Sequence, residues 1–326
     1  MLLYILSIIA GFALLVWSAD RFVEGAAVTA RHLGMPSLLI GILIVGFGTS
    51  APEMVVSAIA ALEGNPALAL GNGLGSNIVN ISLILGVTAL VAPIAVHSNI
   101  VKKELPLLLL IVLFSGYLLF DGTLSFTEGV LLLVGFFTLI GYSIFSALHS
   151  KNDPLKKEVD SELEAHKMTL GIAITWLVIG LVLLVLSSRI LVWGAVGIAH
   201  AFGVSDLIIG LTIVALGTSL PELAASVIAA RKGEHDIAIG NVVGSNMFNI
   251  LAVIGIATVI SPMSNISSEV LYRDWPIMLA LTLMLLLMAY GFNGREGRIN
   301  RLEGAMLLIA YIMYNLYLGL HLLSYI

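Results

Sequence analysis

Residues 47–56 read FGTSAPEMVV and place a proline and a glutamate side by side within an apolar stretch long enough to cross a membrane. The same unusual pair returns at 216–225, which reads LGTSLPELAA. Proline interrupts helical hydrogen bonding, and a charged residue at mid-membrane costs at least about 2.5 kcal/mol. Because one motif keeps both residues in two places, we expect them to have a function.

A repeat relates the two motifs. At a shift of 169 residues, 38–93 and 207–262 align without a gap and share 25 identical positions out of 56. The matches include Gly, Thr, Ser, Pro, Glu and Asn, which hydrophobic bias alone would not align. Five predicted spans separate each element from its copy, and an odd number reverses the direction of the chain. The sequence therefore predicts inverted repeats, which are typical of secondary transporters with a site near the bilayer midplane.

The composition is that of a polytopic membrane protein. Of 326 residues, 59% are hydrophobic and 11% are charged, whereas soluble domains are about half apolar and about a quarter charged. The net charge of −5 gives no reason to expect a nucleic-acid partner, and the absence of cysteine excludes disulfides and thiolate metal sites. We therefore expect an all-α polytopic membrane protein, with ten transmembrane helices arranged as two inverted five-helix repeats. The predicted spans are 2–20, 37–61, 67–93, 104–120, 126–148, 168–192, 205–230, 236–261, 275–292 and 302–323.

These repeats divide the chain into a first five-helix unit at 1–148, a polar linker at 149–167 and a second, inverted unit at 168–326. Two interpretations of the linker stay open: a solvated loop, or a short helix on the membrane surface. Lysine and arginine concentrate in alternate connections, which predicts that these connections, including the linker, are cytoplasmic and that both termini lie outside. We expect a multi-pass protein of the inner (plasma) membrane. The basic residues concerned are Arg31, Lys102, Lys103, Lys151, Lys156, Lys157, Lys167, Arg231, Lys232, Arg295, Arg298 and Arg301.

Each proline is expected to free a backbone carbonyl. Pro52 lacks the N–H that would pair with the carbonyl of Gly48, and Pro221 has the same relation to Gly217. An unpaired carbonyl in hydrocarbon is tolerated only where another group satisfies it, and a dehydrated cation is one such group. The sequence therefore predicts a break in both helices beside a bound cation.

Glu53 and Glu222 follow these prolines directly. A structural carboxylate, paired with Arg21 or Arg189 or kept protonated, is one explanation for each. Their matched positions in two copies of one motif favour a functional pair. The next predicted helix of each repeat adds polar residues four apart, which lie on one face: Asn72, Ser76 and Asn80, and Asn241, Ser245 and Asn249. Whether the first member of each set packs between helices or lines a site stays open.

All these groups are hard oxygen donors, which suit Ca²⁺ and Na⁺ and make a poor site for zinc or copper. Two ionised glutamates carry a charge of −2, which one Ca²⁺ neutralises and which a few Na⁺ ions could also satisfy in overlapping sites. A pocket that holds either load but not both is the minimum needed for exchange. An empty pocket would leave two like charges buried, so the unloaded carrier should resist crossing between states.

At these residues the chain resembles the cation/calcium exchanger superfamily, and within it the sodium/calcium exchanger family of prokaryotes. The motifs that carry the resemblance match the two alpha-repeats of that family: GTSAPE at 48–53, GTSLPE at 217–222, GNGLGSNIVN at 71–80 and GNVVGSNMFN at 240–249. The resemblance extends over essentially the whole chain. It implies electrogenic exchange, commonly of three Na⁺ for one Ca²⁺, by alternating access in which the first and sixth helices slide against a fixed core.

The resemblance also implies a set of ligands. Glu53 and Glu222 would be the central ligands shared by Ca²⁺ and Na⁺, and Asn80 and Asn249 would line the middle. No cofactor is expected beyond the transported ions and the surrounding lipid bilayer. The remaining ligands would be the backbone carbonyls of Thr49 and Thr218 for Ca²⁺, and, for two flanking Na⁺ sites, Ser50 with Ser76 and Ser219 with Ser245, helped by the carbonyls of Gly46 and Ala215.

Two departures from the family pattern limit what the resemblance implies. Position 249 is Asn, whereas some archaeal members and potassium-dependent relatives carry Asp there, so K⁺ co-transport is less expected. The segment 149–167 is too short for the regulatory loop of the eukaryotic exchangers.

Three other functions fit these residues less well than Na⁺/Ca²⁺ exchange. An H⁺/Ca²⁺ antiporter is the nearest alternative, because the same two glutamates could exchange protons for calcium. The Gly-Asn-Ala-x-Glu motif usual in that branch is absent. The inverted repeat disfavours a calcium-permeable channel, and glutamates without a nucleophile or histidine disfavour an intramembrane enzyme. The oligomeric state is not fixed by the sequence, and a monomer is one option.

Overall fold

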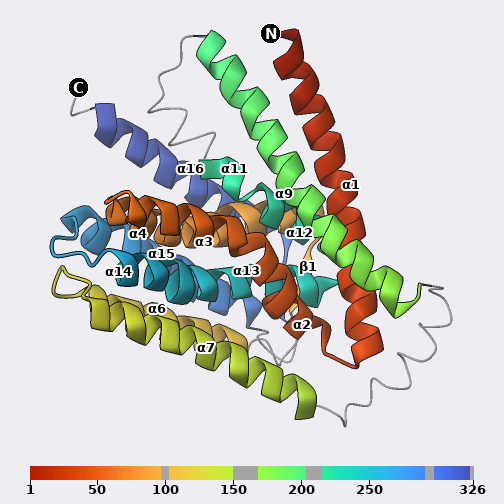
Figure 1. Ribbon diagram of the computed structural model, residues 1–326, viewed down its shortest axis with the longest axis horizontal. Coiled ribbons are helices and arrows are strands. Elements are labelled where there is room, and N and C mark those ends of the chain that lie inside the picture. Colours follow the sequence, from red (N-terminus) through yellow and green to blue (C-terminus); the bar gives the residue numbers. More distant parts are fainter. Residues whose placement is uncertain (97–102, 150–167, 203–214, 291–296, 324–326) are drawn as a thin grey trace.

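The computed structural model describes residues 1–96, 103–149, 168–202, 215–290 and 297–323, and helices dominate them (Figure 1). Within these residues, eight helical stretches are long and apolar enough to cross a membrane, so the chain is a multi-pass membrane protein. The elements, with η for π-helical segments, are α1 (Leu2–Leu33), α2 (Ser37–Ile40), η1 (Gly41–Gly46), α3 (Phe47–Leu62), α4 (Pro66–Val79), η2 (Asn80–Ile84), α5 (Leu85–Val91), β1 (Ile94–Val96), α6 (Leu105–Leu119), α7 (Phe126–His149), α9 (Leu170–Ala201), α11 (Ala215–Thr218), α12 (Leu220–Arg231), α13 (His235–Phe248), η5 (Asn249–Ile254), α14 (Gly255–Ile260), η6 (Val270–Asp274), α15 (Trp275–Ala289), β2 (Gly297–Ile299) and α16 (Arg301–Leu323).

The predicted spans meet different outcomes. Eight of the ten coincide with these long helical stretches. The span predicted at 104–120 is α6, which is apolar but shorter than the others. The span predicted at 205–230 is described only from Ala215 onward, and the linker lies outside the described residues apart from His149. The count of ten and the inverted relation of two units therefore stay predictions.

The long helices α1 and α9 lie side by side and antiparallel (Figure 1). Glycine at their contact lets the two backbones approach closely. A Cβ built on Gly11 would lie 2.9 Å from the backbone nitrogen of Leu191, and one built on Gly180 would lie 2.8 Å from Cα of Phe22. Trp17 of α1 and Trp176 of α9 pack edge to face across this contact, with 5.8 Å between their ring centroids.

Both of these helices extend past their predicted ends at residues 20 and 192. The apolar stretch of α1 ends at the first charged residue, but the helix continues to Leu33 because tertiary contacts satisfy those charges. Lys232, which follows α12, lies 2.8 Å from the carboxylate of Asp20 and 3.8 Å from that of Glu24.

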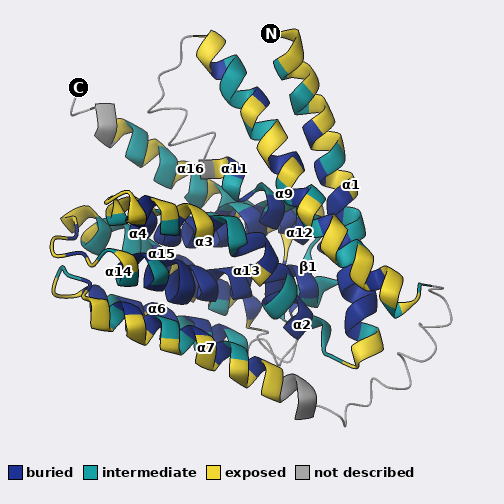
Figure 2. Ribbon diagram, in the orientation of Figure 1, coloured by how far each residue is buried: buried dark blue, intermediate teal, exposed yellow. Residues whose placement is uncertain are grey.

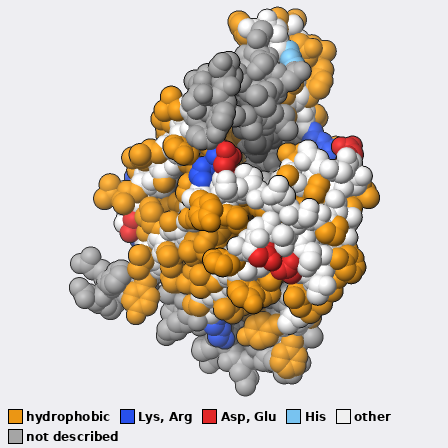
Figure 3. All heavy atoms as spheres, turned by 90° about the vertical axis from the view of Figure 1, so that its left-hand side faces the viewer, with side chains coloured by type: hydrophobic (Ala, Val, Ile, Leu, Met, Phe, Trp, Pro, Cys, Tyr) orange, Lys and Arg blue, Asp and Glu red, His pale blue; other side chains and the backbone are white. Residues whose placement is uncertain are grey.

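Helix α13 lies at the centre of the remaining helices and is buried along almost its whole length (Figure 2). Small residues allow the segment α2–η1 to lie directly against it: a Cβ on Gly240 would lie 2.8 Å from the carbonyl oxygen of Leu38, and one on Gly244 would lie 2.8 Å from Cα of Ile42. The outward-facing side chains of the outer helices are mostly apolar, and hydrophobic side chains cover much of the face drawn in Figure 3. Such a surface suits contact with lipid.

A small antiparallel sheet, which was not predicted, accompanies the helices. Strand β1 pairs with β2 in the register Ile94↔Ile299, Ala95↔Arg298 and Val96↔Gly297. An isolated bridge joins Leu124 to Met263, with N–H···O distances of 2.7 and 2.8 Å. Strands of three residues are too short to produce a recognisable alternation of polar and apolar residues.

The two prolines act differently. Pro52 lies inside α3, which continues through it, so the predicted break is wrong in the first repeat. The missing N–H of Pro52 removes one hydrogen bond, which does not end the helix here. In the second repeat the helix is interrupted at Ser219, as predicted, and Pro221 lies in the first turn of α12. A proline is well tolerated there because that N–H has no helical partner in any case.

Candidate functional site

Glu53 on α3 and Glu222 on α12 are both buried, with 2% of each residue exposed. Their carboxylates lie near enough to repel each other. Arg21 is not the partner of either, because it pairs with Glu24 at 3.0 Å and lies over the ring of Trp176. A structural ion pair with Arg21 therefore does not explain the two buried carboxylates.

Several buried acceptor oxygens of the predicted ligands lack hydrogen-bond partners. Five of them have no partner among the described residues: Oε1 and Oε2 of Glu53, Oε2 of Glu222, and Oδ1 of Asn80 and of Asn249. Buried polar atoms are normally paired, so unpaired acceptors need an explanation. A desolvated cation would account for them, because it would supply the positive charge that the missing donors would have supplied.

The Thr49 hydroxyl lies beside three acceptor oxygens. Its Oγ1 lies 3.0 Å from the carbonyl oxygen of Val45, 3.4 Å from that of Gly46 and 3.0 Å from Oδ1 of Asn241. A hydroxyl has one proton, so it can donate to only one of these three acceptors at a time. At least two oxygens beside Thr49 are therefore without a proton from it.

Two of the predicted ligands come together across the two halves of the chain. The Ser245 hydroxyl of α13 donates to the carbonyl of Gly46 in η1 at 3.3 Å. Ser76 and Ser219 are buried, and the buried Ser50 hydroxyl has no hydrogen-bond partner among the residues described.

Two residues whose backbone carbonyls were predicted as ligands lie in α11. Thr218, the last residue of α11, is half-buried, unlike its buried counterpart Thr49. Ala215 begins α11, and the structure describes its backbone but not its side chain. The carbonyl of Gly217, which Pro221 was predicted to free, accepts a hydrogen bond of 2.7 Å from the Ser188 hydroxyl of α9. A side chain of another helix therefore supplies a partner for this carbonyl.

The structure shows what Asn72 and Asn241 do. The amide of Asn241 donates to the Ser226 hydroxyl at 2.8 Å and to the backbone carbonyl of Glu222 at 3.2 Å. The amide of Asn72 makes the equivalent bonds, to the Ser57 hydroxyl at 2.9 Å and to the backbone carbonyl of Glu53 at 3.4 Å. Each asparagine therefore fixes the backbone that carries one of the two carboxylates.

Two further asparagines, Asn77 and Asn246, were missed. The amide of Asn80 donates to Oδ1 of Asn246 at 3.0 Å, and the amide of Asn249 donates to Oδ1 of Asn77 at 3.1 Å. Both lie outside the polar stripes read at intervals of four residues. The signal that could have found them is the repeat itself, in which positions 77 and 246 are equivalent and identical.

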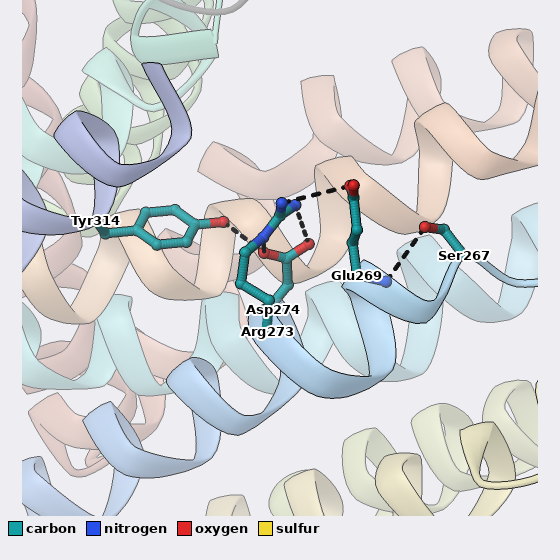
Figure 4. Close-up of polar contacts among 5 residues, drawn as sticks. All are labelled: Ser267, Glu269, Arg273, Asp274 and Tyr314. Atoms are coloured by element: carbon teal, nitrogen blue, oxygen red, sulfur yellow. Dashed lines mark hydrogen bonds and ion pairs between the residues drawn. The ribbon is translucent and has the colours of Figure 1, made fainter. Parts of the chain in front are cut away.

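Another charged group, at the start of α15, differs from this site because its charges are satisfied internally (Figure 4). Arg273 donates to both carboxylate oxygens of Asp274, at 2.7 and 3.0 Å, and to Glu269 at 3.3 Å. The Tyr314 hydroxyl of α16 donates to Asp274 at 2.9 Å. The bond from Tyr314 ties η6, which leads directly into α15, to α16.

No group of three or more His, Cys, Asp or Glu side chains able to hold a metal ion occurs in the part of the chain that the structure describes. Any cation in the central site would depend on amide, hydroxyl and backbone oxygens beside the two carboxylates. Such donors select hard cations such as Na⁺ and Ca²⁺.

Comparison with known proteins covers nearly the whole chain. Residues 3–145 and 172–320 match the family model described as Sodium/calcium exchanger protein. The protein CaxA of Alkalimonas amylolytica is 50% identical over 96% of this chain and 98% of its own length. Sodium/calcium exchanger MaX1 of Methanosarcina acetivorans is 31% identical over 95% of this chain and 96% of its own. A structure of the sodium-calcium exchanger NCX_Mj at zero Na⁺ and Ca²⁺ superposes with a TM-score of 0.83 and 31% identity, over 97% of this chain and 99% of that one.

Proposed function

Because this chain belongs to the sodium/calcium exchanger family of prokaryotes, we propose that it is a secondary active antiporter that exchanges Na⁺ for Ca²⁺. Membership of the family supports exchange of calcium for another cation. Our proposal adds Na⁺ as the counter-ion, electrogenic exchange of three Na⁺ for one Ca²⁺, and alternating access to a site at mid-membrane. The observation that carries it is that five buried acceptor oxygens of Glu53, Glu222, Asn80 and Asn249 have no hydrogen-bond partner among the described residues.

The proposed central ligands are the carboxylates of Glu53 and Glu222, with the amide oxygens of Asn80 and Asn249. Ca²⁺ takes about six to eight oxygen ligands, and the unpaired oxygens supply a large part of such a set. The contact between Ser245 and the carbonyl of Gly46 supports a flanking Na⁺ site built from both halves. The other proposed ligands are the carbonyls of Thr49, Thr218 and Ala215, and the hydroxyls of Ser50, Ser76 and Ser219.

Charge explains why the two loads would exclude each other. The two glutamates provide −2, which one Ca²⁺ balances, so Ca²⁺ and a full load of Na⁺ in the same ligands would leave excess positive charge buried. An empty site would leave two facing carboxylates without compensation, which is unfavourable in a desolvated interior. Only a carrier with bound cation would therefore change readily between its outward-facing and inward-facing states. Transport of one cation would then depend on transport of the other in the opposite direction.

Pairs of equivalent contacts support two inverted five-helix units, at 1–148 and 168–326, joined by the linker 149–167. Adding or subtracting 169 converts the contact of Gly11 with Leu191 into that of Gly180 with Phe22, and the structure contains both contacts. A chain repeated in opposite orientations about one axis would produce such pairs.

Contacts between loops support the proposed orientation in an inner membrane, with both termini outside. Arg31 in the first connection bonds Glu234 in the seventh at 2.6 Å, and β1 in the third pairs with β2 in the ninth. The bridge between Leu124 and Met263 joins the fourth connection to the eighth. Each contact joins connections that the alternation of spans places on one face, and the basic residues would make the odd-numbered face cytoplasmic.

The test is Ca²⁺ uptake into proteoliposomes loaded with Na⁺, compared with uptake driven by a pH gradient alone. We expect Ca²⁺ uptake with the Na⁺ gradient. Uptake should be faster when the vesicle interior is held positive, because three Na⁺ leave for each Ca²⁺ that enters and one net positive charge is exported. Uptake with the pH gradient only would replace the proposal with H⁺/Ca²⁺ exchange. Flux that does not saturate and needs no counter-ion would indicate a channel.

The glutamates are tested by Glu53→Gln and Glu222→Gln, which remove charge and keep shape. Breaking a compensated buried charge costs about 3–5 kcal/mol, so Ca²⁺ transport at fixed Ca²⁺ should fall by about two to four orders of magnitude. Glu63→Gln is the matched control, because Glu63 is exposed at the end of the same helix α3. Full transport by either central variant would disprove the proposed site.

A further inference from the structure

Two pairs of buried asparagines connect the halves of the chain at the centre of the proposed site. The amide nitrogen of Asn80, where η2 begins, donates to Oδ1 of Asn246 at 3.0 Å. The amide nitrogen of Asn249, where η5 begins, donates to Oδ1 of Asn77 at 3.1 Å. All four residues are at most 2% exposed. The two pairs are equivalent under the 169-residue repeat, so the arrangement occurs twice.

A carboxamide can be a cation ligand in one orientation only. Its oxygen accepts, its nitrogen donates, and the two ends are nearly the same size, so packing alone does not decide which end faces a cavity. Turned the wrong way, the NH₂ group would place positive partial charge beside a cation. An amide that serves as a ligand therefore needs a neighbour that distinguishes its two ends.

Asn246 and Asn77 provide that distinction. In each pair, the neighbour presents an acceptor oxygen to the amide nitrogen of Asn80 or Asn249. The Oδ1 atoms of Asn80 and Asn249 are then left unpaired and buried among the described residues, as a cation would require. We infer that Asn246 and Asn77 are positioning residues that fix the amide orientation of Asn80 and Asn249. This inference rests on the proposed function, because it assigns the two oriented oxygens to Ca²⁺.

The two positioning residues differ in their other contacts. Asn77 also donates to the backbone carbonyl of Asn246 at 3.2 Å and to the sulfur of Met278 at 3.3 Å, so it also joins α4 to α13. The amide nitrogen of Asn246 has no partner among the residues described. The contribution of Asn246 therefore comes from its acceptor oxygen, which makes it the better residue to test.

The experiment is a double-mutant cycle between positions 246 and 80 in proteoliposomes. Asn246→Leu removes the acceptor at similar volume, and should raise the KM for Ca²⁺ about tenfold while the maximal rate stays within about twofold. In an Asn80→Ala background the oriented oxygen is already gone, so Asn246→Leu should change KM by less than about twofold. Asn246→Asp keeps the acceptor and should not raise KM. Asn315→Leu, in α16 where the amide bonds only its own helix, is the matched control.

A tenfold effect of Asn246→Leu in both backgrounds would overturn the inference, because the residue would then act independently of Asn80. An unchanged KM in the single variant would overturn it too. If Asn246→Leu does not fold, the Ca²⁺-induced rise in Tm of purified Asn246→Asp provides the test, and loss of that rise counts against the inference. Failure of the proposed function is separate: wild-type protein would then show no Ca²⁺ uptake and no Ca²⁺-dependent rise in Tm.

Discussion

Substitution of Gly25 tests the close contact between α1 and α9. A Cβ at this position would lie 2.6 Å from the backbone nitrogen of Leu177 and 2.7 Å from the carbonyl oxygen of Ala173. These are backbone atoms of α9 that cannot rotate away. Ordinary van der Waals contact begins near 3.4 Å, so Gly25→Ala must move the helices apart by up to the difference of 0.8 Å.

The magnitude follows from the dispersion energy lost across that gap. A separation of 0.5–1 Å forfeits about a quarter to a half of each contact, and each contact contributes about 0.1–0.2 kcal/mol. Over roughly 40 atom pairs, the number typical of one buried large side chain, the loss is about 2 kcal/mol. This agrees with the cost of about 1–3 kcal/mol for inserting a methyl group into a packed core. We therefore expect the Tm of Gly25→Ala to fall by several degrees.

Tryptophan fluorescence during thermal unfolding is a suitable assay. Three of the four tryptophans lie on α1 or α9, so the signal reports on this pair of helices. Gly171→Ala is the matched control, because no described atom lies within 4 Å of a Cβ at that position of α9. Equal Tm values for Gly25→Ala and Gly171→Ala would refute the close approach of the two backbones.

Three further predictions concern single polar contacts. Ser188→Ala removes the donor to the buried carbonyl of Gly217, and should lower the free energy of unfolding by about 1–3 kcal/mol, measured as a fall in Tm. Tyr314→Phe removes one of the donors to Asp274 and should cost about 1 kcal/mol, measured in the same way, with Ca²⁺ uptake unchanged. Asn249→Asp adds a third carboxylate to the site and should change the ion preference or the pH dependence of uptake, measured in proteoliposomes.

Each of these three predictions has a control variant or an outcome that would contradict it. Ser187→Ala, whose hydroxyl bonds only its own helix at Leu184, should leave Tm nearly unchanged, and a fall equal to that of Ser188→Ala would contradict the role given to Ser188. Tyr272→Phe, with 84% of the residue exposed, is the control for Tyr314. An unchanged ion and pH profile in Asn249→Asp would show that this position lies at the edge of the site.

The features that the sequence predicted well are those that depend on pattern within one stretch or on the repeat. The membrane-spanning class follows from long apolar segments, and most predicted spans coincide with helices. The repeat selected Glu53 and Glu222. In the structure both are buried, and their carboxylates lie near enough to repel each other. Whether they bind cations stays a proposal.

The features that it did not predict depend on residues distant in the chain. Helix α1 continues past Asp20 because Lys232, more than two hundred residues later, compensates the charge. The carbonyl of Gly217 is satisfied by Ser188 of another helix, which no local pattern around Pro221 reveals. The spacing of four residues that marks a polar helical face does not reveal Asn246, whose partner Asn80 lies on the other half of the protein.

The short strands make the two halves of the chain depend on each other for backbone hydrogen bonds. In each half, the segment that follows the third predicted span pairs with the segment that precedes the last span of the other half: β1 with β2, and Met263 with Leu124. Neither half can complete these pairings alone, so each half by itself would leave two segments with unpaired backbone groups.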